Sequence, residues 1–151
     1  MGASPRVLGA SADWRRGALM VVALAGVALA AYLTYVHYRP EALVCTASGG
    51  CETVQKSDYA TIIGIPVALL GLVMWSLVAV LTALDGPLSR AATATIGLAS
   101  VAFSAYLVIL QLIVIDAVCV WCMINDVVLV PLLAVLAMWR LRLDLRAGAY
   151  H

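Results

Sequence analysis

Four long apolar stretches, separated by short polar segments, dominate the pattern of hydrophobic and polar positions along this chain. They lie at about residues 17–36, 59–84, 91–115 and 118–139. Each is close to or above the roughly 20 residues that an α-helix needs to cross a bilayer, and none shows the strict alternation of a membrane β-strand. The pattern therefore predicts an all-α integral membrane protein with a bundle of four transmembrane helices.

The same pattern divides the chain into a membrane domain and two tails. Residues 17–139 are expected to hold the four helices, and residues 37–58 form the loop between the first two. The tails are residues 1–16 and 140–151. We expect contact with membrane lipid throughout the domain, because its helices carry almost no charge.

The composition supports a membrane protein. Of the 151 residues, 65% are hydrophobic and 11% are charged, and the mean hydropathy is +1.06. A soluble domain of this length cannot bury so much apolar surface. The first apolar stretch follows Arg15 and Arg16, as a secretory signal would, but it is longer than the roughly 7–15 apolar residues of such signals and lacks a clear cleavage site. We therefore expect it to be retained as a helix.

Basic residues predict the orientation of the bundle. Seven of the nine lie in the tails and the second loop: Arg6, Arg15, Arg16, Arg90, Arg140, Arg142 and Arg146. Only Arg39 and Lys56 lie in the first loop. Because positively charged segments resist translocation, both termini are expected in the cytoplasm. The loop 37–58 and the start of the fourth helix then face the other side.

The four cysteines form two pairs that this topology brings to one membrane face. Cys45 and Cys51 lie in the outer loop, within CTASGGC, and Cys119 and Cys122 lie at the outer end of the fourth helix, within DAVCVWCMIND. An extracytoplasmic compartment is oxidising and permits disulfides. Two redox-active pairs and two structural disulfides both fit this placement.

The spacing of the second pair favours redox chemistry. At the first turn of a helix, C-x-x-C has a thiolate stabilised by the helix dipole, and the thiolate is the attacking species in disulfide exchange. A disulfide across so short a loop removes little entropy from the unfolded chain, so it adds little stability. Zinc is disfavoured, because the first pair is spaced C-x5-C and only His37 lies outside the C-terminal tail. The glycines of CTASGGC let that loop bend and move, as a relay requires.

These motifs, in this order, resemble the vitamin K epoxide reductase family in its bacterial form. The segment CTASGGCETVQKSDYATIIGIPVALLGL is similar to the family's loop cysteine pair, its following serine and the Gly-x-Pro that starts the second helix. The segment YLVILQLIVIDAVCVWC is similar to its third helix running into the redox C-x-x-C. The resemblance covers about residues 17–139. DsbB-type disulfide generators also have four helices and two cysteine pairs, but in the reverse order.

The resemblance implies a membrane thiol:quinone oxidoreductase that supports disulfide bond formation. Cys45 and Cys51 would oxidise a thioredoxin-like, DsbA-like protein, and the electrons would pass to Cys119 and Cys122. Cys122 would face the electron acceptor, a quinone of the menaquinone, ubiquinone or vitamin K type. The order in which the two loop cysteines act stays open at this point.

The resemblance also carries expectations about surroundings. The chain ends at His151 without room for the fused thioredoxin-like domain of many bacterial members, so a separate partner protein is expected. We expect no metal and no nucleic acid, and a location in the bacterial inner membrane with the redox site on the periplasmic or extracellular side. The alternatives are a DsbB-like generator of separate ancestry and a non-catalytic membrane protein with structural disulfides.

Two further residues near the cysteines are candidates for the site. Ser57 matches the family's serine and is expected to support the loop over the site, although a serine before a helix is equally typical of an N-cap. Trp121, inside C-x-x-C, is expected either to anchor the helix at the membrane interface or to line the quinone pocket. Gln111 and the small residues of the third stretch, such as Ser104, are expected to serve helix packing.

The carboxylates that flank C-x-x-C differ in their surroundings. Asp116 precedes the helix, where an acid complements the helix dipole, and this role is favoured over proton transfer. Asp126 lies one turn beyond Cys122 inside the apolar span, where an acid is costly and tends to face a polar cavity. Asp126 is therefore predicted to contact the quinone or deliver protons. Asn125 points about 100° away around a helix, so the two are not expected to face one ligand together.

Overall fold

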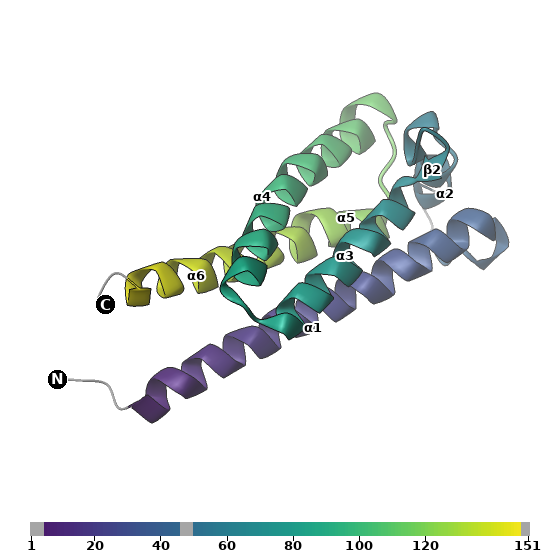
Figure 1. Ribbon diagram of the computed structural model, residues 1–151. Coiled ribbons are helices and arrows are strands. Elements are labelled where there is room, and N and C mark those ends of the chain that lie inside the picture. The colour runs from purple at the N-terminus through teal and green to yellow at the C-terminus, as the bar shows by residue number, and fades with distance from the viewer. Residues whose placement is uncertain (1–4, 46–49, 149–151) are drawn as a thin grey trace.

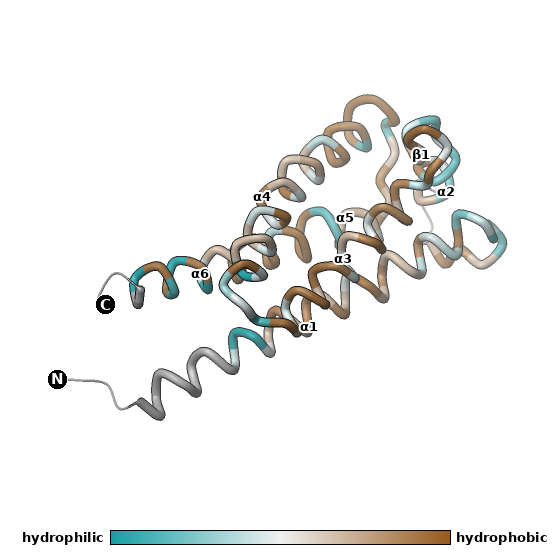
Figure 2. The backbone as a smooth tube through the Cα atoms, in the orientation of Figure 1, coloured by the Kyte–Doolittle hydropathy of each residue, from teal (hydrophilic) through white to brown (hydrophobic). Residues whose placement is uncertain are grey.

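The computed structural model describes residues 5–45 and 50–148 (Figure 1). Within these ranges four helices are long and apolar enough to cross a membrane: Trp14–Tyr38, Val67–Leu84, Pro87–Val114 and Val120–Arg146. Apolar residues cover most of their length, and polar residues gather at turns and ends (Figure 2). The prediction of an all-α integral membrane protein with four transmembrane helices is confirmed.

Each span is built from one or more helical elements. The first belongs to α1 (Pro5–Tyr38) and the second is α3 (Val67–Leu84). The third joins α4 (Pro87–Ile109) to the π-helical turn η3 (Leu110–Val114). The fourth runs through α5 (Val120–Met123), the π-helical turn η4 (Ile124–Leu129) and α6 (Val130–Gly148).

Short elements connect α1 to α3. They are η1 (Pro40–Ala42), α2 (Gly50–Gln55), η2 (Asp58–Ala60) and a hairpin of β1 (Thr61–Ile62) and β2 (Ile65–Pro66). The hairpin is antiparallel and pairs Thr61 with Pro66 and Ile62 with Ile65. In Figure 1 α2 and the hairpin lie together beside the first residue of α3, at the end of the bundle where α5 begins.

The second span begins later than the hydrophobic pattern predicts, at Val67 instead of near residue 59. The apolar residues before it form the hairpin, whose tip residues Ile63 and Gly64 have positive φ angles of 53° and 78°. Glycine adopts such angles readily, and they end any helix. Pro66 then supplies the residue before the first turn of α3, where its missing N–H does no harm. Hydrophobicity continues through this segment although the helix does not.

The centre of the bundle is a tightly packed core formed by α1, α3 and α6. Its buried members are Leu19, Ala23, Ala30, Trp75, Val78, Val130 and Leu133. Gly26 lies under the indole of Trp75 so closely that a Cβ there would overlap the ring. At the crossing of α4 and α6, a Cβ on Gly97 would lie 3.1 Å from the Cα of Ala134. Small residues at these positions allow close helix approach, as is usual in membranes.

The end of the bundle remote from the cysteines is held by charges around Asp85. This residue links α3 to α4 with a positive φ of 50°. Its carboxylate accepts hydrogen bonds from Arg90 of α4, at 2.9 Å, and from the buried Arg140 of α6. Arg16 of α1 lies 3.7 Å from the same carboxylate and also donates to the carbonyl of Ala83. All four spans are therefore joined through one acid.

Candidate functional site

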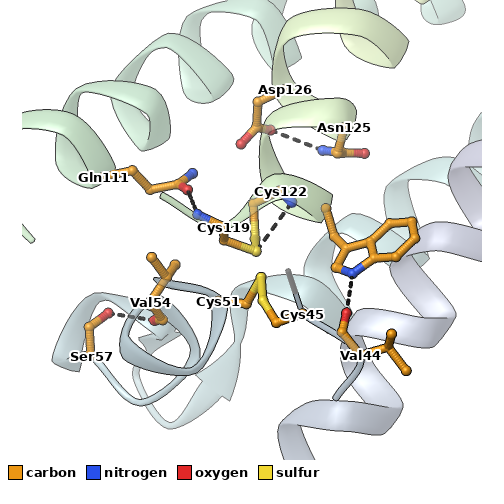
Figure 3. The surroundings of a disulfide bond; sticks show 11 residues. Val44, Cys45, Cys51, Val54, Ser57, Gln111, Cys119, Cys122, Asn125 and Asp126 are labelled. Carbon is orange, nitrogen blue, oxygen red and sulfur yellow. Dashed lines mark hydrogen bonds between the residues drawn. A yellow bond between two sulfur atoms is a disulfide. The ribbon is translucent and has the colours of Figure 1, made fainter. Parts of the chain in front are cut away.

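The two cysteine pairs lie together at one end of the bundle (Figure 3). Cys45 is joined to Cys51 and Cys119 is joined to Cys122, each by a disulfide. Figure 3 shows the sulfur of Cys51 directed toward the second disulfide. Segments 68 residues apart in sequence, Cys51 to Cys119, thus meet at the contact between α2 and α5. The two cysteine pairs therefore lie at the same end of the bundle, as the predicted topology requires.

The cysteines differ in burial. Cys51 and Cys119 are 1% and 0% exposed, whereas Cys45 and Cys122 are half-buried. Gly50 lets α2 approach the segment before Cys119 closely, because a Cβ on it would collide with the carbonyl oxygen of Val118. The first turn of α2 therefore rests directly on the backbone that leads into Cys119.

Cys119 occupies the N-terminal position of the fourth helical span. Its sulfur accepts a hydrogen bond from the backbone N–H of Cys122 at 3.3 Å, in the manner of an N-cap. Amide groups at a helix N-terminus stabilise negative charge, so this position favours a thiolate once the disulfide is opened. The prediction of C-x-x-C at the first helical turn agrees with this geometry.

Gln111 holds that turn in place, a role that sequence reasoning missed. The side chain is 3% exposed, and its Oε1 accepts from the backbone N–H of Cys119 at 2.9 Å. Its backbone carbonyl accepts from Ala117 at 3.0 Å. The expectation was a helix-packing residue, and a lone polar residue in an apolar helix gives little sign of a backbone partner eight positions away.

Trp121 connects the loop between α1 and α3 to the C-x-x-C turn. Its indole Nε1 donates to the carbonyl of Val44 at 2.8 Å, and the Val44 N–H donates to the hydroxyl of Tyr32 at 2.9 Å. The rings of Tyr32 and Trp121 meet edge to face, with centroids 5.6 Å apart. Among the described residues, Trp121 is not one of those that line the main cavity, which is the cavity beside Cys122 described below. Its contacts instead fix the residue before Cys45.

Ser57 lies after α2, near the C-terminal end of the loop that carries Cys45 and Cys51. Its hydroxyl donates to the carbonyl of Val54 at 2.8 Å, and its backbone N–H points to the same oxygen at 3.3 Å. Ser57 is also the residue before η2, yet its side chain makes no capping bond there. The hydroxyl therefore completes the C-terminal turn after α2, and Ser57 faces the cavity described next.

A cavity of about 390 Å³ lies beside Cys122, between α3, α4 and the fourth span. Most of its lining residues are apolar, and α3 and α4 contribute several of them, for example Leu70, Met74 and Phe103. Cys122 lines the cavity, and of the four cysteines it alone does so. The size lies within the range of pockets that bind small organic molecules. Polar groups are few: Gln55, Ser57, Tyr59, Ser100, Ser104, Gln111, Asn125 and Asp126.

Asp126 is buried in this wall at the centre of a hydrogen-bond network. Its Oδ1 accepts from the hydroxyl of Ser104 at 2.8 Å and from the amide of Asn125 at 2.9 Å. The Oδ1 of Asn125 accepts from the indole of Trp75 at 2.9 Å. Asn125 and Asp126, both within the π-helical turn η4, line the cavity together, contrary to the α-helical expectation.

Comparison with known proteins agrees with the motifs. The model of the vitamin K epoxide reductase family matches residues 18–137. Over 54 residues the chain is 41% identical to "Thiol-disulfide oxidoreductase LTO1" of Arabidopsis thaliana, a stretch that makes up 35% of the chain. The chain covers only 14% of the length of that relative. Because the family match covers most of the chain and all four cysteines, the chain belongs to the vitamin K epoxide reductase family.

Proposed function

We propose that the protein is a membrane thiol-disulfide oxidoreductase that passes electrons from a thioredoxin-like dithiol protein to a quinone. One observation carries the proposal: Cys51 and Cys119 are both buried where α2 contacts α5, while Cys122 alone among the cysteines faces an apolar cavity. Family membership supports it, as does the name of the plant relative. Two static staples would gain nothing from this staggered arrangement.

The burial of the cysteines suggests the order of exchange. A partner thiolate attacks the sulfur of the half-buried Cys45, which forms a mixed disulfide and releases Cys51. Cys51 then attacks Cys119 and releases Cys122 as a thiolate. Cys45, freed by the second cysteine of the partner, attacks Cys51 and releases Cys119. The net result is a disulfide in the partner and the dithiol of Cys119 and Cys122 in this chain.

The cavity fits a quinone by its size, its apolar wall and its polar groups near Cys122. A bound quinone would supply a two-electron, two-proton acceptor. Cys122 and Cys119 would then close to a disulfide again, each losing a proton. Ser57, Gln111 and Trp121 hold the two cysteine-bearing segments around the cavity mouth.

The same proposal includes an orientation. Arg16, Arg90 and Arg140 lie at the end of the bundle opposite the cysteines. Basic residues favour the cytoplasmic side, which puts the cysteines on the extracytoplasmic side of a bacterial inner membrane. Disulfide exchange with a periplasmic or extracellular partner needs that placement.

Two cysteine variants test the order of exchange in the full chain reconstituted in lipid. In Cys51→Ala the free thiol of Cys45 should attack a single-cysteine thioredoxin-like protein supplied as its mixed disulfide with thionitrobenzoate, releasing thionitrobenzoate and forming a mixed disulfide that nothing in the chain resolves. Cys45→Ala leaves Cys51 to bond Cys119 instead, which non-reducing peptide mapping detects. If the partner is trapped on Cys51, the proposed order is wrong.

The Cys122→Ala variant tests the reaction itself. Reduced wild-type protein should convert decylubiquinone to its quinol, and Cys122→Ala should lose this conversion while keeping its thermal unfolding midpoint. Equal rates in the two proteins, or no quinone reduction by wild type, would contradict the proposed function and favour structural disulfides.

A further inference from the structure

Asp126 is a buried acid for which the exchange of disulfides has no use. Among the residues whose side chains the structure describes, 14–45, 50–146 and 148, it is the only buried acidic residue, and none of the ion pairs there includes it. An acid within a membrane span is costly and tends to persist where it acts on a substrate or a proton. The surroundings of Asp126 identify which of its oxygens can act.

The network around Asp126 assigns its proton to one oxygen. The indole N–H of Trp75 is only a donor, so the atom of Asn125 that it meets is the amide oxygen. The NH2 group of Asn125 must therefore face Asp126, where it donates to Oδ1. The hydroxyl of Ser104 donates to the same oxygen. With two donors on Oδ1, a proton on this carboxyl group resides on Oδ2.

The cavity brings this group to the reacting sulfur. Asp126 and Cys122 both line its wall, one turn apart in the fourth span. In Figure 3 the second carboxylate oxygen of Asp126 points away from Asn125. Tyr59, from the outer loop, is the other titratable residue among the described lining residues. The lining residues contributed by α3 and α4 are uncharged, so no cation there holds Asp126 ionised.

We propose that Asp126 carries a proton from the Cys122 thiol to an oxygen of the bound acceptor, through Oδ2. This inference rests on the proposed function and adds a residue to it. Closing the Cys119–Cys122 disulfide releases two electrons and two protons, and a quinone that becomes a quinol takes up two of each. Asp126 donates its Oδ2 proton to the quinone oxygen and takes a proton from the Cys122 thiol as the sulfur bond forms, so its own protonation is restored and no net proton enters or leaves. Ser104 and Asn125 are positioning residues, because they act on Oδ1.

Asp126→Asn tests the proposal in the full chain, reconstituted in lipid nanodiscs. The amide keeps the size of the side chain and accepts from Ser104, but it carries no transferable acid proton. In a single turnover of reduced protein with decylubiquinone, the rate should fall at least about 100-fold, the usual scale for a lost general acid or base. The pH profile of that step should lose one ionisation. Asp126→Glu should recover most of the rate.

An infrared measurement without quinone provides an independent readout. Reducing and reoxidising the Cys119–Cys122 pair should shift a carboxylic acid band in wild type, and that band should be absent from Asp126→Asn. Asp116→Asn is the matched control: Asp116 is exposed, has a positive φ of 51° that asparagine also adopts, and lies outside the lining of the main cavity. Its single-turnover rate should equal that of wild type.

The outcomes separate this inference from the function on which it rests. If wild type reduces decylubiquinone and Asp126→Asn does so at the same rate, the proton-carrying role is wrong and the oxidoreductase remains. A wild-type protein that leaves the quinone oxidised contradicts both. An Asp126→Asn protein that is slow but keeps the wild-type pH profile and infrared band would show a structural role only, which also overturns the inference.

Discussion

Gly50 allows α2, which carries Cys51, to pack closely against the segment before Cys119. Its Cα position leaves no room for a side chain against the Val118 carbonyl oxygen. We expect Gly50→Ala to push α2 away from the segment before Cys119, at a cost of about 1–3 kcal/mol, as for other overpacked sites. The measurement is the rate of exchange between the reduced loop pair and the Cys119–Cys122 disulfide, which should fall.

Gly17 provides the control for this substitution. It lies in α1, and a Cβ there would meet nothing within 4 Å. Gly17→Ala should leave the exchange rate unchanged and leave stability equal or slightly higher, because alanine favours a helix. If Gly50→Ala exchanges as fast as Gly17→Ala, the packing of α2 on Val118 does not control the relay.

At the residue scale, the sequence predicted the part of the site that short motifs encode. The C-x-x-C spacing and the polar Asp126 within an apolar run are local signals, and Cys122 and Asp126 both line the cavity. Gln111 and Trp75 gave no such signal, because their partners are 8 and 50 positions away. Contacts of this kind depend on how helices pack, which a hydrophobic pattern does not specify.

At the scale of elements, the loop between α1 and α3 is held to the fourth span through Trp121. Trp121→Phe keeps the aromatic contact with Tyr32 but removes the hydrogen bond to Val44, worth about 0.5–1.5 kcal/mol. We expect faster hydrogen exchange of the Val44 amide and greater reactivity of the reduced Cys45 thiol toward a maleimide. Trp139→Phe, at the remote end of the fourth span, should leave both unchanged. Equal exchange at Val44 in the two variants would contradict the tether.

The elements themselves were predicted unevenly. Apolar length placed all four spans, because burial in lipid is the strongest constraint on this chain. It misplaced the start of the second helix by including the hairpin with Ile63 and Gly64, where hydrophobic residues continue in a turn. It also gave no sign of the π-helical turns η3, which holds Gln111, and η4, which holds Asn125 and Asp126, and all three residues line the cavity. Such turns are common at functional sites and have no simple sequence period.

At the scale of the whole molecule, the end of the bundle that carries the cysteines differs from the end that carries the Asp85 cluster. The cysteine-bearing segments are short elements that the proposed exchange would rearrange, whereas the Asp85 cluster fixes α1, α4 and α6 at the other end. Burial favours the neutral form of the Asp85 carboxyl, but the Arg90 hydrogen bond and the charges of Arg140 and Arg90 outweigh it. The pKa of Asp85 therefore lies below its ordinary value.

This shift predicts how stability depends on pH. A carboxyl whose pKa is lower in the folded state stabilises the fold at pH values above its unfolded pKa, which is about 4. That contribution is lost as the pH falls through the pKa of the folded state. Asp85→Asn suits the positive φ of this position but removes the charge. In detergent micelles near neutral pH we expect it to be less stable than wild type by about 1.5–3 kcal/mol, the scale of a charged hydrogen bond.

The difference in thermal unfolding midpoint between wild type and Asp85→Asn should shrink as pH falls below about 4, because wild-type Asp85 then becomes neutral as well. Glu41→Gln is the control. Glu41 forms an exposed ion pair with Arg39, with 3.6 Å between the charged atoms, so this substitution should change the midpoint little at any pH. A constant difference between wild type and Asp85→Asn across this range would mean that the charge of Asp85 does not hold the spans together. The joint would then depend on the shape of the turn and on the capping of α3 by Arg16, which donates to the carbonyls of Thr82 and Ala83 without help from the acid.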